Sequence, residues 1–343
     1  MAKSKSTRRE FDWRGYTKPC RLLSTEQEAA FATGLLSPLL GWSRARDSAR
    51  FEIRSRQAAI YDSGTMLLRI RGAEAPFVAE IDANVRLPRA QRSGAERLET
   101  WPLSSADEVS AVTKELDALK ALNDEHLVGE QLPERAALHA FASAHDGRSD
   151  RDGDYIVVDT EFHYGKRRFD FVGMRHAEGV AGSAGFTTPR LVFGQLKSAG
   201  RPLAGSSGLM AHAADFAEFA QALGGTHLAT ARAELDELVR QKLRLGLLSE
   251  TIPFRHFTED RPEYLVVFSD VDLASPDLDG PLAEMHDRLV ARHYQPELLR
   301  LAGIATEGLP SARHVPVIEA DDVMTYREFK RARKQLRNED ADR

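Results

Sequence analysis

Two apolar runs near the middle of the chain, RRFDFVGMR at 167–175 and RLVFGQLKSAG at 190–200, decide the fold class. Their apolar residues are nearly continuous, which is typical of β-strands that are covered on both faces. Each run also carries polar side chains among its apolar neighbours: Asp170 in the first run, and Gln195 and Lys197 in the second. Because a buried polar group without a partner is costly, these residues indicate a site within the sheet.

A third apolar run, DYIVVDTEF at 154–162, predicts a strand just before these two. Side chains alternate between the two faces of a strand, so the parity of a residue predicts its face. By this rule Asp170 points away from Phe169 and Phe171, which share the opposite face. If the three strands are neighbours, one face of the sheet gathers two carboxylates, an amide and an ammonium: Glu161, Asp170, Gln195 and Lys197.

The N-terminal part of the chain has a different pattern. Between 51 and 87 it consists of short β-prone runs, with Asp62-Ser63-Gly64 as a hairpin turn between two of them. We therefore expect an N-terminal β-rich module over 1–90, built on a small antiparallel sheet. Residues 88–104 are polar and contain prolines, which is typical of a domain boundary.

A second domain is expected over 105–343. Ser105 and Glu108 form a capping-box pattern at the start of its helical lead-in, and a basic helix ends the chain. Helices alternating with buried strands predict an α/β layout around one mixed sheet. Besides the three strands above, the periodicity predicts helices from 105, from 133, at 207–223, 227–248 and 281–294, and strands at 263–271 and 313–320.

The composition is that of an ordered globular protein, with 42% hydrophobic and 8% aromatic residues among 343. The single cysteine, Cys20, excludes an internal disulfide framework. With no signal peptide and no long apolar run, we expect a cytoplasmic protein without a membrane contact. The net charge is −5, but basic residues cluster at 3–9, 166–168 and 327–337, and such clusters matter more than the total for phosphate contacts.

The polar set on the three strands suits phosphodiester hydrolysis. Hard oxygen ligands hold a divalent cation, which polarises a phosphate and lowers the pKa of a water molecule. A lysine ammonium beside them stabilises the negative charge that develops. Other chemistries fit the sequence less well, because it contains no P-loop or dinucleotide-type glycine motif, no zinc-ligand set and no nucleophile elbow.

At these residues the chain resembles the PD-(D/E)XK nuclease superfamily. The motif is FDF with Asp170, followed by QLK with Gln195 and Lys197, and Glu161 lies where many members carry a further strand carboxylate. The Gln-x-Lys form is similar to that of the Mrr-like branch. The resemblance covers about 130–270 and implies a restriction-endonuclease-like mixed sheet flanked by helices.

The resemblance also implies an activity. The chain would be a metal-dependent endonuclease acting on DNA, in bacterial defence or DNA processing. Asp170, Gln195 and Glu161 would hold Mg²⁺ or Mn²⁺, and Lys197 would orient or deprotonate the attacking water. Beside such a site, the basic turn is expected to bind the nucleic acid backbone through Lys166, Arg167 and Arg168.

Several alternatives stay open. Gln195 stands where an acid is usual, so the fold could be a catalytically decayed nuclease that acts as a nucleic-acid-binding or assembly protein. Glu161 could instead pair with Arg167 or Arg168, and we leave Asp159 outside the site as a support for the neighbouring strand. The N-terminal module could restrain the nuclease, or make the contact of a homodimer or with a partner protein.

Overall fold

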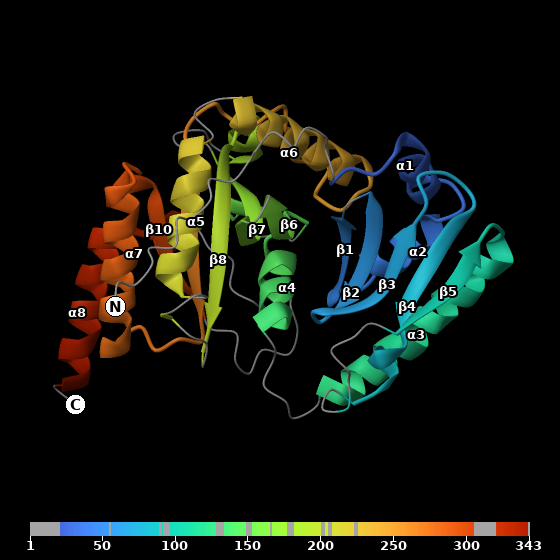
Figure 1. Ribbon diagram of the computed structural model, residues 1–343, viewed down its shortest axis with the longest axis horizontal. Helices are drawn as coiled ribbons and strands as arrows, with labels where there is room; N and C mark the ends of the chain where they lie inside the picture. The colour runs from blue at the N-terminus through green and yellow to red at the C-terminus, as the bar shows by residue number, and fades with distance from the viewer. Residues whose placement is uncertain are drawn as a thin grey trace, which may run out of the picture.

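The computed structural model places two β-sheets side by side (Figure 1). One sheet has five strands and the other has six among the described residues. The residues described are 21–54, 56–88, 91, 97–127, 134–148, 153–164, 167–176, 182–199, 203–204, 208–222, 226–304 and 320–341.

The N-terminal sheet is an antiparallel meander in which each strand pairs with the next one in the chain. The predicted turn is confirmed: β2 ends at Asp62 and β3 begins at Thr65, with positive φ at Ser63 (46°) and Gly64 (81°). Such angles suit a two-residue hairpin loop. The strands are β1 (Ala49–Arg54), β2 (Gln57–Asp62), β3 (Thr65–Arg71), β4 (Phe77–Asp82) and β5 (Leu98–Leu103).

Three helices accompany this sheet: α1 (Thr25–Ala32), α2 (Ser37–Arg44) and α3 (Ala106–Leu127). The predicted capping box of α3 is present. The amide of Glu108 donates to the hydroxyl of Ser105 at 3.3 Å, and the amide of Ser105 donates to the Glu108 carboxylate at 3.0 Å. Helix α3 packs against β3 and β5, so it covers a face of the N-terminal sheet.

The second sheet is mixed, with strand order β11-β10-β9-β8-β7-β6. Strands β6, β7 and β8 are antiparallel, β9 and β10 run parallel to β8, and β11 is antiparallel to β10. This confirms an α/β protein with a mixed sheet. The strands are β6 (Tyr155–Tyr164), β7 (Arg167–Arg175), β8 (Arg190–Ser198), β9 (Glu263–Ser269), β10 (Leu299–Ile304) and β11 (Met324–Thr325).

Helices cover both faces of the mixed sheet. On one face, α4 packs against β6, β7 and β8, and on the other, α5 packs against β7 and then against α7. Helix α8 contacts β10 and β11 near the opposite edge. The helices are α4 (Glu134–Ala144), α5 (Leu209–Ala222), α6 (Thr226–Arg244), α7 (Asp279–Ala291) and α8 (Tyr326–Ala341).

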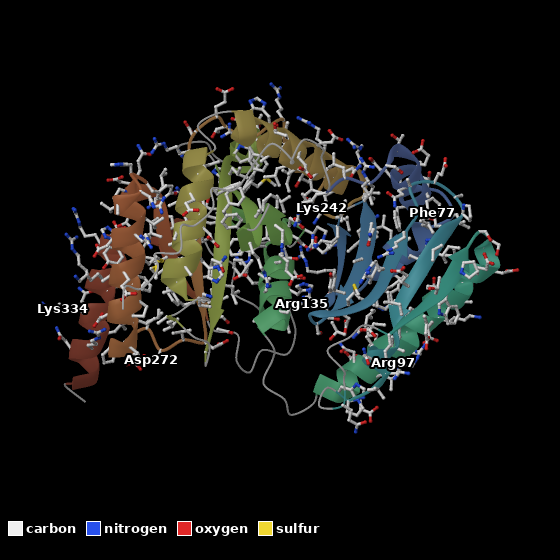
Figure 2. The ribbon with its side chains drawn as sticks, viewed as in Figure 1. Phe77, Arg97, Arg135, Lys242, Asp272 and Lys334 are labelled. Carbon is white, nitrogen blue, oxygen red and sulfur yellow. The ribbon has the colours of Figure 1, made fainter. Side chains whose placement is uncertain are left out.

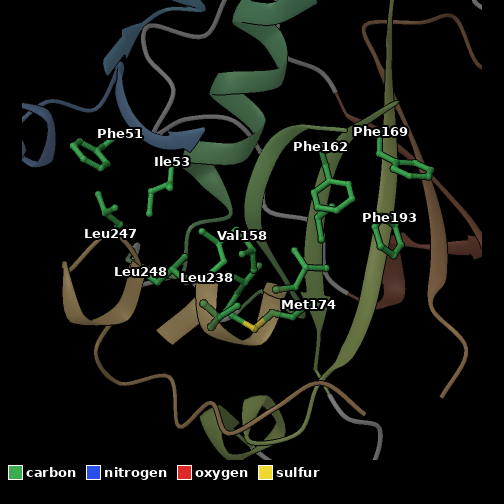
Figure 3. Close-up of a cluster of buried hydrophobic side chains, with 14 of the residues drawn as sticks. Phe51, Ile53, Val158, Phe162, Phe169, Met174, Phe193, Leu238, Leu247 and Leu248 are labelled. Atoms are coloured by element: carbon green, nitrogen blue, oxygen red, sulfur yellow. The ribbon is translucent and has the colours of Figure 1, made fainter. Parts of the chain in front are cut away.

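One apolar cluster runs through both sheets. Helix α6 extends from the mixed sheet towards β1, and the turn after it carries Leu247 and Leu248. In Figure 3 these leucines lie beside Phe51 and Ile53 of β1, while Val158 of β6 completes the contact. Polar residues accompany this core, since Arg135 and Lys242 also lie between the sheets (Figure 2).

The structure also contains elements that the sequence pattern did not predict. Strand β5 lies inside the stretch 88–104 that was expected to be a linker, and α1, α2 and β10 were not predicted either. Strand β5 is an exposed edge strand that contains Pro102, so it lacks the continuous apolar pattern of the strands that were found. The strand expected at 313–320 falls outside the described residues. Among the described residues, no helix has both the length and the apolar character needed to cross a membrane.

Candidate active site between two diverging strands

The candidate site lies where the β7–β8 ladder stops. The last pair in this ladder is Phe171 with Gly194, so Asp170 and Gln195 are the next residues on the two strands. Beyond that pair, side chains take the place of backbone partners. The Asp170 carboxylate accepts the amide N–H of Leu196 at 2.9 Å, and the Gln195 side-chain nitrogen donates to the Arg168 carbonyl at 3.2 Å.

An irregularity in β7 sets the direction of Asp170. Phe171 packs on Phe141 of α4 at 5.2 Å, whereas Phe169 packs on Phe193 at 4.9 Å and on Phe219 of α5 at 5.3 Å. The two phenylalanines therefore lie on opposite faces, and the expectation that they share one face is wrong. Regular alternation would put residues two apart on the same face, so the strand is distorted between them. That distortion turns Asp170 towards β8.

Gly194 makes the close approach of the strands possible. A Cβ atom at this position would lie 1.9 Å from the ring of Phe171, much closer than atoms in contact can approach. Phe171 thus fills the space on the α4 side of β8, directly beside the end of the ladder. Glycine is required at this position for packing, because the neighbouring strand supplies the missing side-chain volume.

The amide of Gln195 is only half satisfied. Its side chain is fully buried and its nitrogen has a partner, but its oxygen, Oε1, has no hydrogen-bond partner among the described residues. Leaving a buried acceptor unpaired costs about 1–3 kcal/mol. Lys197, two residues further along β8, is also buried, as is Asp170. The three residues of the predicted motif therefore occupy one buried region, with an oxygen available for a ligand.

Sequence reasoning missed two residues near this region, Tyr264 and Asp215. Tyr264 of β9 pairs with Phe193 of β8 and stacks on Phe216 of α5 at 4.6 Å. Burial raises the pKa of the Tyr264 hydroxyl well above its usual range, and the negative charges of Asp170 and Asp215 raise it further. This hydroxyl is also buried without a hydrogen-bond partner. The signal in the sequence was a polar-tipped residue inside the apolar run at 263–271.

Glu161 lies across from Asp170 in strand register, because Thr160 pairs with Phe171 and Phe162 pairs with Phe169. Its carboxylate, however, is bound by Arg135 of α4 and lies 3.3 Å from Arg168. Burial tends to raise the pKa of Glu161, but these arginines, Arg135 above all, hold it below its usual value. The alternative of an ion pair with Arg168 is therefore what the structure contains.

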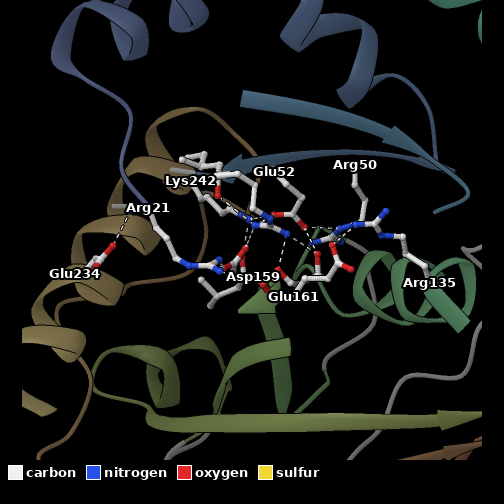
Figure 4. Close-up of polar contacts among 12 residues, drawn as sticks. Arg21, Arg50, Glu52, Arg135, Asp159, Glu161, Glu234 and Lys242 are labelled. Atoms are coloured by element: carbon white, nitrogen blue, oxygen red, sulfur yellow. Dashed lines mark hydrogen bonds and ion pairs between the residues drawn. The ribbon is translucent and has the colours of Figure 1, made fainter. Parts of the chain in front are cut away.

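The backbone of Glu161 is unusual as well. Its φ is +50°, a left-handed conformation that is uncommon outside glycine. Its carbonyl accepts a hydrogen bond from Arg21 at 3.0 Å. The neighbouring Asp159 is fully buried and bound by Arg21, which Figure 4 shows beside it, and by Arg54. Asp159, which the sequence analysis left outside the site, belongs to the contact between the sheets.

Of the three residues expected to bind nucleic acid, one is described completely. The side chain of Arg168 is half exposed and faces Glu161, while its carbonyl is the partner of Gln195. Lys166 lies outside the described residues, and so does the side chain of Arg167. The basic turn thus stays a prediction for those two positions.

A divalent metal fits this region as a site built from few protein ligands. Among the described residues, no group of three or more His, Cys, Asp and Glu side chains is placed to hold a metal ion. Magnesium is commonly bound by one or two carboxylates, with water and phosphate oxygens completing its shell. Asp170 would supply one carboxylate, and the oxygen of Gln195, which has no partner among the described residues, would supply a second ligand that is neutral.

Comparison with known proteins gives no relative for this arrangement: neither a protein-family model, nor a curated protein, nor a solved structure matches the chain. Function is therefore inferred from the region beyond the last β7–β8 pair, Phe171 with Gly194, which we call the gap between β7 and β8. Three features of this gap are relevant: the distorted strand at Asp170, the amide oxygen of Gln195 without a described partner, and the buried Lys197.

Proposed function

We propose that the protein is a magnesium-dependent endonuclease that hydrolyses phosphodiester bonds of DNA. The observation that carries this proposal is the unpaired, buried oxygen of Gln195 in the same gap as the Asp170 carboxylate. A buried acceptor that lacks a protein donor is suited to a cation. Bacterial defence or DNA processing is the setting that we propose for this activity.

The topology supports a restriction-endonuclease-like arrangement. Helix α4 precedes the antiparallel β6, β7 and β8, helix α5 follows on the opposite face, and β9 then runs parallel to β8. This order agrees with the helix, three strands and flanking helix that the resemblance implies. It also puts Asp170 on the second strand and Gln195 with Lys197 on the third, as the motif requires.

In this proposal Asp170 and Gln195 hold the metal ion. Bound Mg²⁺ would polarise the scissile phosphate and lower the pKa of a water molecule. Glu161 is the third proposed ligand, but its carboxylate is bound to Arg135 and Arg168, so it could join only after those ion pairs break. While Glu161 stays in these ion pairs, Asp170 is the one protein ligand of the proposed site that carries a negative charge.

The remaining roles belong to the basic residues. The ammonium of Lys197 would hold the attacking water and stabilise the charge that develops on the phosphate. Its burial strengthens that interaction, because charges attract more strongly away from bulk water. Arg168, half exposed at the start of β7, would contact a neighbouring phosphate of the backbone.

The proposal is tested by incubating the purified full-length protein with Mg²⁺ or Mn²⁺ and duplex DNA, single-stranded DNA or RNA. We expect cleavage of DNA, and Lys197→Met should reduce the rate by about 10²–10⁴-fold. Lys114→Met, at an exposed position of α3, is the matched control and should cut like the parent. The proposal fails if the parent leaves all three substrates intact, or if Lys197→Met cuts equally well.

A decayed nuclease that binds nucleic acid without cutting it is the second candidate. It is favoured by the neutral amide at Gln195 and by the ion pairs that occupy Glu161, which leave few anionic ligands. Calorimetry with Mn²⁺ separates the two candidates. An active site predicts binding that Asp170→Ala abolishes and that Gln195→Glu strengthens, whereas a decayed site predicts no binding in the parent and no effect of Asp170→Ala.

A further inference from the structure

A second cluster of buried charges lies between the two sheets (Figure 4). Its centre is formed by two fully buried carboxylates, Glu52 of β1 and Asp159 of β6. Cations from several elements surround them, and each of their side chains is less than one-fifth exposed. These cations are Arg21 (7%), Arg50 (7%), Arg54 (17%) and Lys242 (2%).

The two carboxylates are saturated by their neighbours. Glu52 lies 3.0 Å from Nε of Arg50 and 2.7 Å from Nζ of Lys242, and it also accepts the Thr160 hydroxyl at 3.0 Å. Asp159 is bound by two of the arginines. The other carboxylates of the region, Glu161 and Asp146, are paired with Arg135 and Arg148. The four cations therefore face only Glu52 and Asp159, which leaves a surplus of two positive charges. Such a surplus is costly in a buried region unless an anion balances it.

Some donors of these cations have no acceptor among the described residues. Arg50 makes one hydrogen bond, from Nε to Glu52, so its two terminal nitrogens donate to no described residue. Lys242 donates to Glu52 and to the carbonyl of Val158, which leaves the third proton of an ammonium free. The N–H groups without a described acceptor thus belong to Arg50 and Lys242, which are two of the four buried cations.

His139 of α4 is a further buried polar group in the field of Arg50, although it does not line the cavity described next. Its side chain is buried, and neither ring nitrogen has a hydrogen-bond partner in the structure. Burial is the main reason why the pKa of His139 falls to about 3, and the positive charge of Arg50 contributes to this decrease. The histidine is therefore neutral near pH 7 and adds no charge, but its N–H lacks an acceptor.

A small cavity opens beside the surplus charge. Its volume is about 20 Å³, whereas one water molecule needs about 10–15 Å³ by the same measure. The cavity is partly open, and its accessible volume matches a single small ligand. Three of the residues that line it are cations, Arg50, Arg148 and Lys242, and Ser43 and Asp146 supply the other polar side chains.

We propose that this cavity binds a small inorganic anion of halide size, held by Arg50, Lys242 and Arg148. A water molecule would accept hydrogen bonds from the donors but would leave the surplus positive charge unbalanced. A monatomic anion would accept the hydrogen bonds and also balance the charge. The carboxylate of Asp146 does not compensate the surplus, because it is paired with Arg148. The ligand class is thus fixed by charge, and its size is fixed by the cavity.

The anion would act on the junction between the sheets. Lys242 of α6 binds the Val158 carbonyl, and Arg54 of β1 binds Thr160, so both cations hold the backbone or side chains of β6. A bound anion would keep the surrounding cations charged and in place. The N-terminal sheet would then be attached to the mixed sheet more firmly in halide than in its absence.

The first experiment measures thermal unfolding of the full-length protein in sodium chloride, sodium bromide and sodium gluconate at one ionic strength. Binding to the folded state alone predicts a saturable rise of Tm in chloride and bromide, by about 2–4 °C over gluconate. Arg148→Gln should abolish this rise. Its matched control is Arg86→Gln, since Arg86 is equally exposed (32% against 33%) and also pairs with acidic residues, but does not line the cavity.

A second measurement does not depend on a variant that folds. Crystals of the parent grown in bromide should give an anomalous peak between Arg50 and Lys242. The proposal is overturned if Tm is the same in all three salts, if Arg148→Gln keeps the chloride effect, or if the bromide peak is absent from the cavity.

Discussion

The two buried polar clusters of this protein differ in how completely their oxygen atoms are paired. At the junction of the sheets, Glu52 and Asp159 are surrounded by arginine, lysine and threonine donors. In the gap between β7 and β8, the oxygen of Gln195 accepts no hydrogen bond although it is just as deeply buried. The junction cluster spans both sheets, with Glu52 on β1 and Asp159 on β6, and its Asp159 is on the strand adjacent to that of Asp170.

The difference shows that a buried acid is not in itself a sign of a functional site. Asp159 is more buried than Asp170, yet its two arginine partners give it a structural role. An acceptor without a donor is the more informative feature, because proteins rarely leave one buried. On this criterion the gap is the candidate catalytic site, and the carboxylates of the junction hold the sheets together.

The largest effect is expected when the saturated cluster is broken. Glu52→Ala leaves Arg50, Arg54 and Lys242 without their shared carboxylate, so the free energy of unfolding should fall by about 3–5 kcal/mol. Urea denaturation followed by circular dichroism measures this change. As a control, Glu115→Ala removes the partly exposed ion pair with Arg86 and should cost no more than about 1 kcal/mol. Equal losses in the two variants would contradict the comparison.

A pH effect of intermediate size is expected at the junction. Burial lowers the pKa of His139 from 6.5 to about 3, so between these values the unfolded chain binds a proton that the folded state does not. Stability should therefore fall as the pH drops below about 6.5, by about 2 kcal/mol at pH 5. His145, lowered to about 4, adds a similar loss.

Urea midpoints at pH 7.5 and pH 5 measure this dependence. His139→Phe should remove roughly half of the loss that the two histidines cause together, because it removes one of two comparable groups. The exposed His256 is the control position, and His256→Phe should change with pH like the parent. If His139→Phe keeps the whole pH dependence, His139 is not a buried neutral group.

A smaller loss is expected from Gly194→Ala beside the site. The new Cβ would lie 1.9 Å from the Phe171 ring, and such overpacking costs about 1–3 kcal/mol. Phe171→Leu shortens the opposing side chain, so the double variant should be more stable than the sum of the two single changes. Strict additivity of the three unfolding free energies would show that the two residues do not press on each other.

Much of the fold could be predicted from local patterns. The strands β6, β7 and β8 follow from continuous apolar runs, and the turn at Ser63 and Gly64 follows from residues that tolerate positive φ. The capping box of α3 was visible in the spacing of Ser105 and Glu108. These features depend on residues close together in the chain, which is why the sequence discloses them.

The missing parts depend on distant residues or on weak patterns. Glu161 is bound by Arg135 and Arg21, which lie 26 and 140 positions away, so parity alone assigned it to the metal site. The distortion of β7 at Asp170 arises because Phe169 and Phe171 find pockets on opposite faces. Strand β5 is short, exposed and proline-containing, and only its pairing with β4 makes it a strand.

The smallest change in stability is expected at Asp170, where the effect on metal binding should be large. Asp170→Asn keeps an oxygen that can accept the Leu196 amide but removes the negative charge. The free energy of unfolding should change by less than about 1 kcal/mol, since the hydrogen bond survives. Loss of a direct ligand should weaken Mn²⁺ binding by more than about 100-fold, a larger effect than the loss of a supporting residue.

Denaturation and Mn²⁺ calorimetry on the same preparation make the contrast with Glu52 direct. Glu52→Gln, the corresponding isosteric change at the junction, should lose stability and keep Mn²⁺ binding, because its carboxylate binds the cations and the Thr160 hydroxyl of the junction. Asp170→Asn should do the reverse. If Asp170→Asn were instead the less stable variant and still bound Mn²⁺, the gap would be a structural cluster like the junction, and the argument from the unpaired Gln195 oxygen would fail.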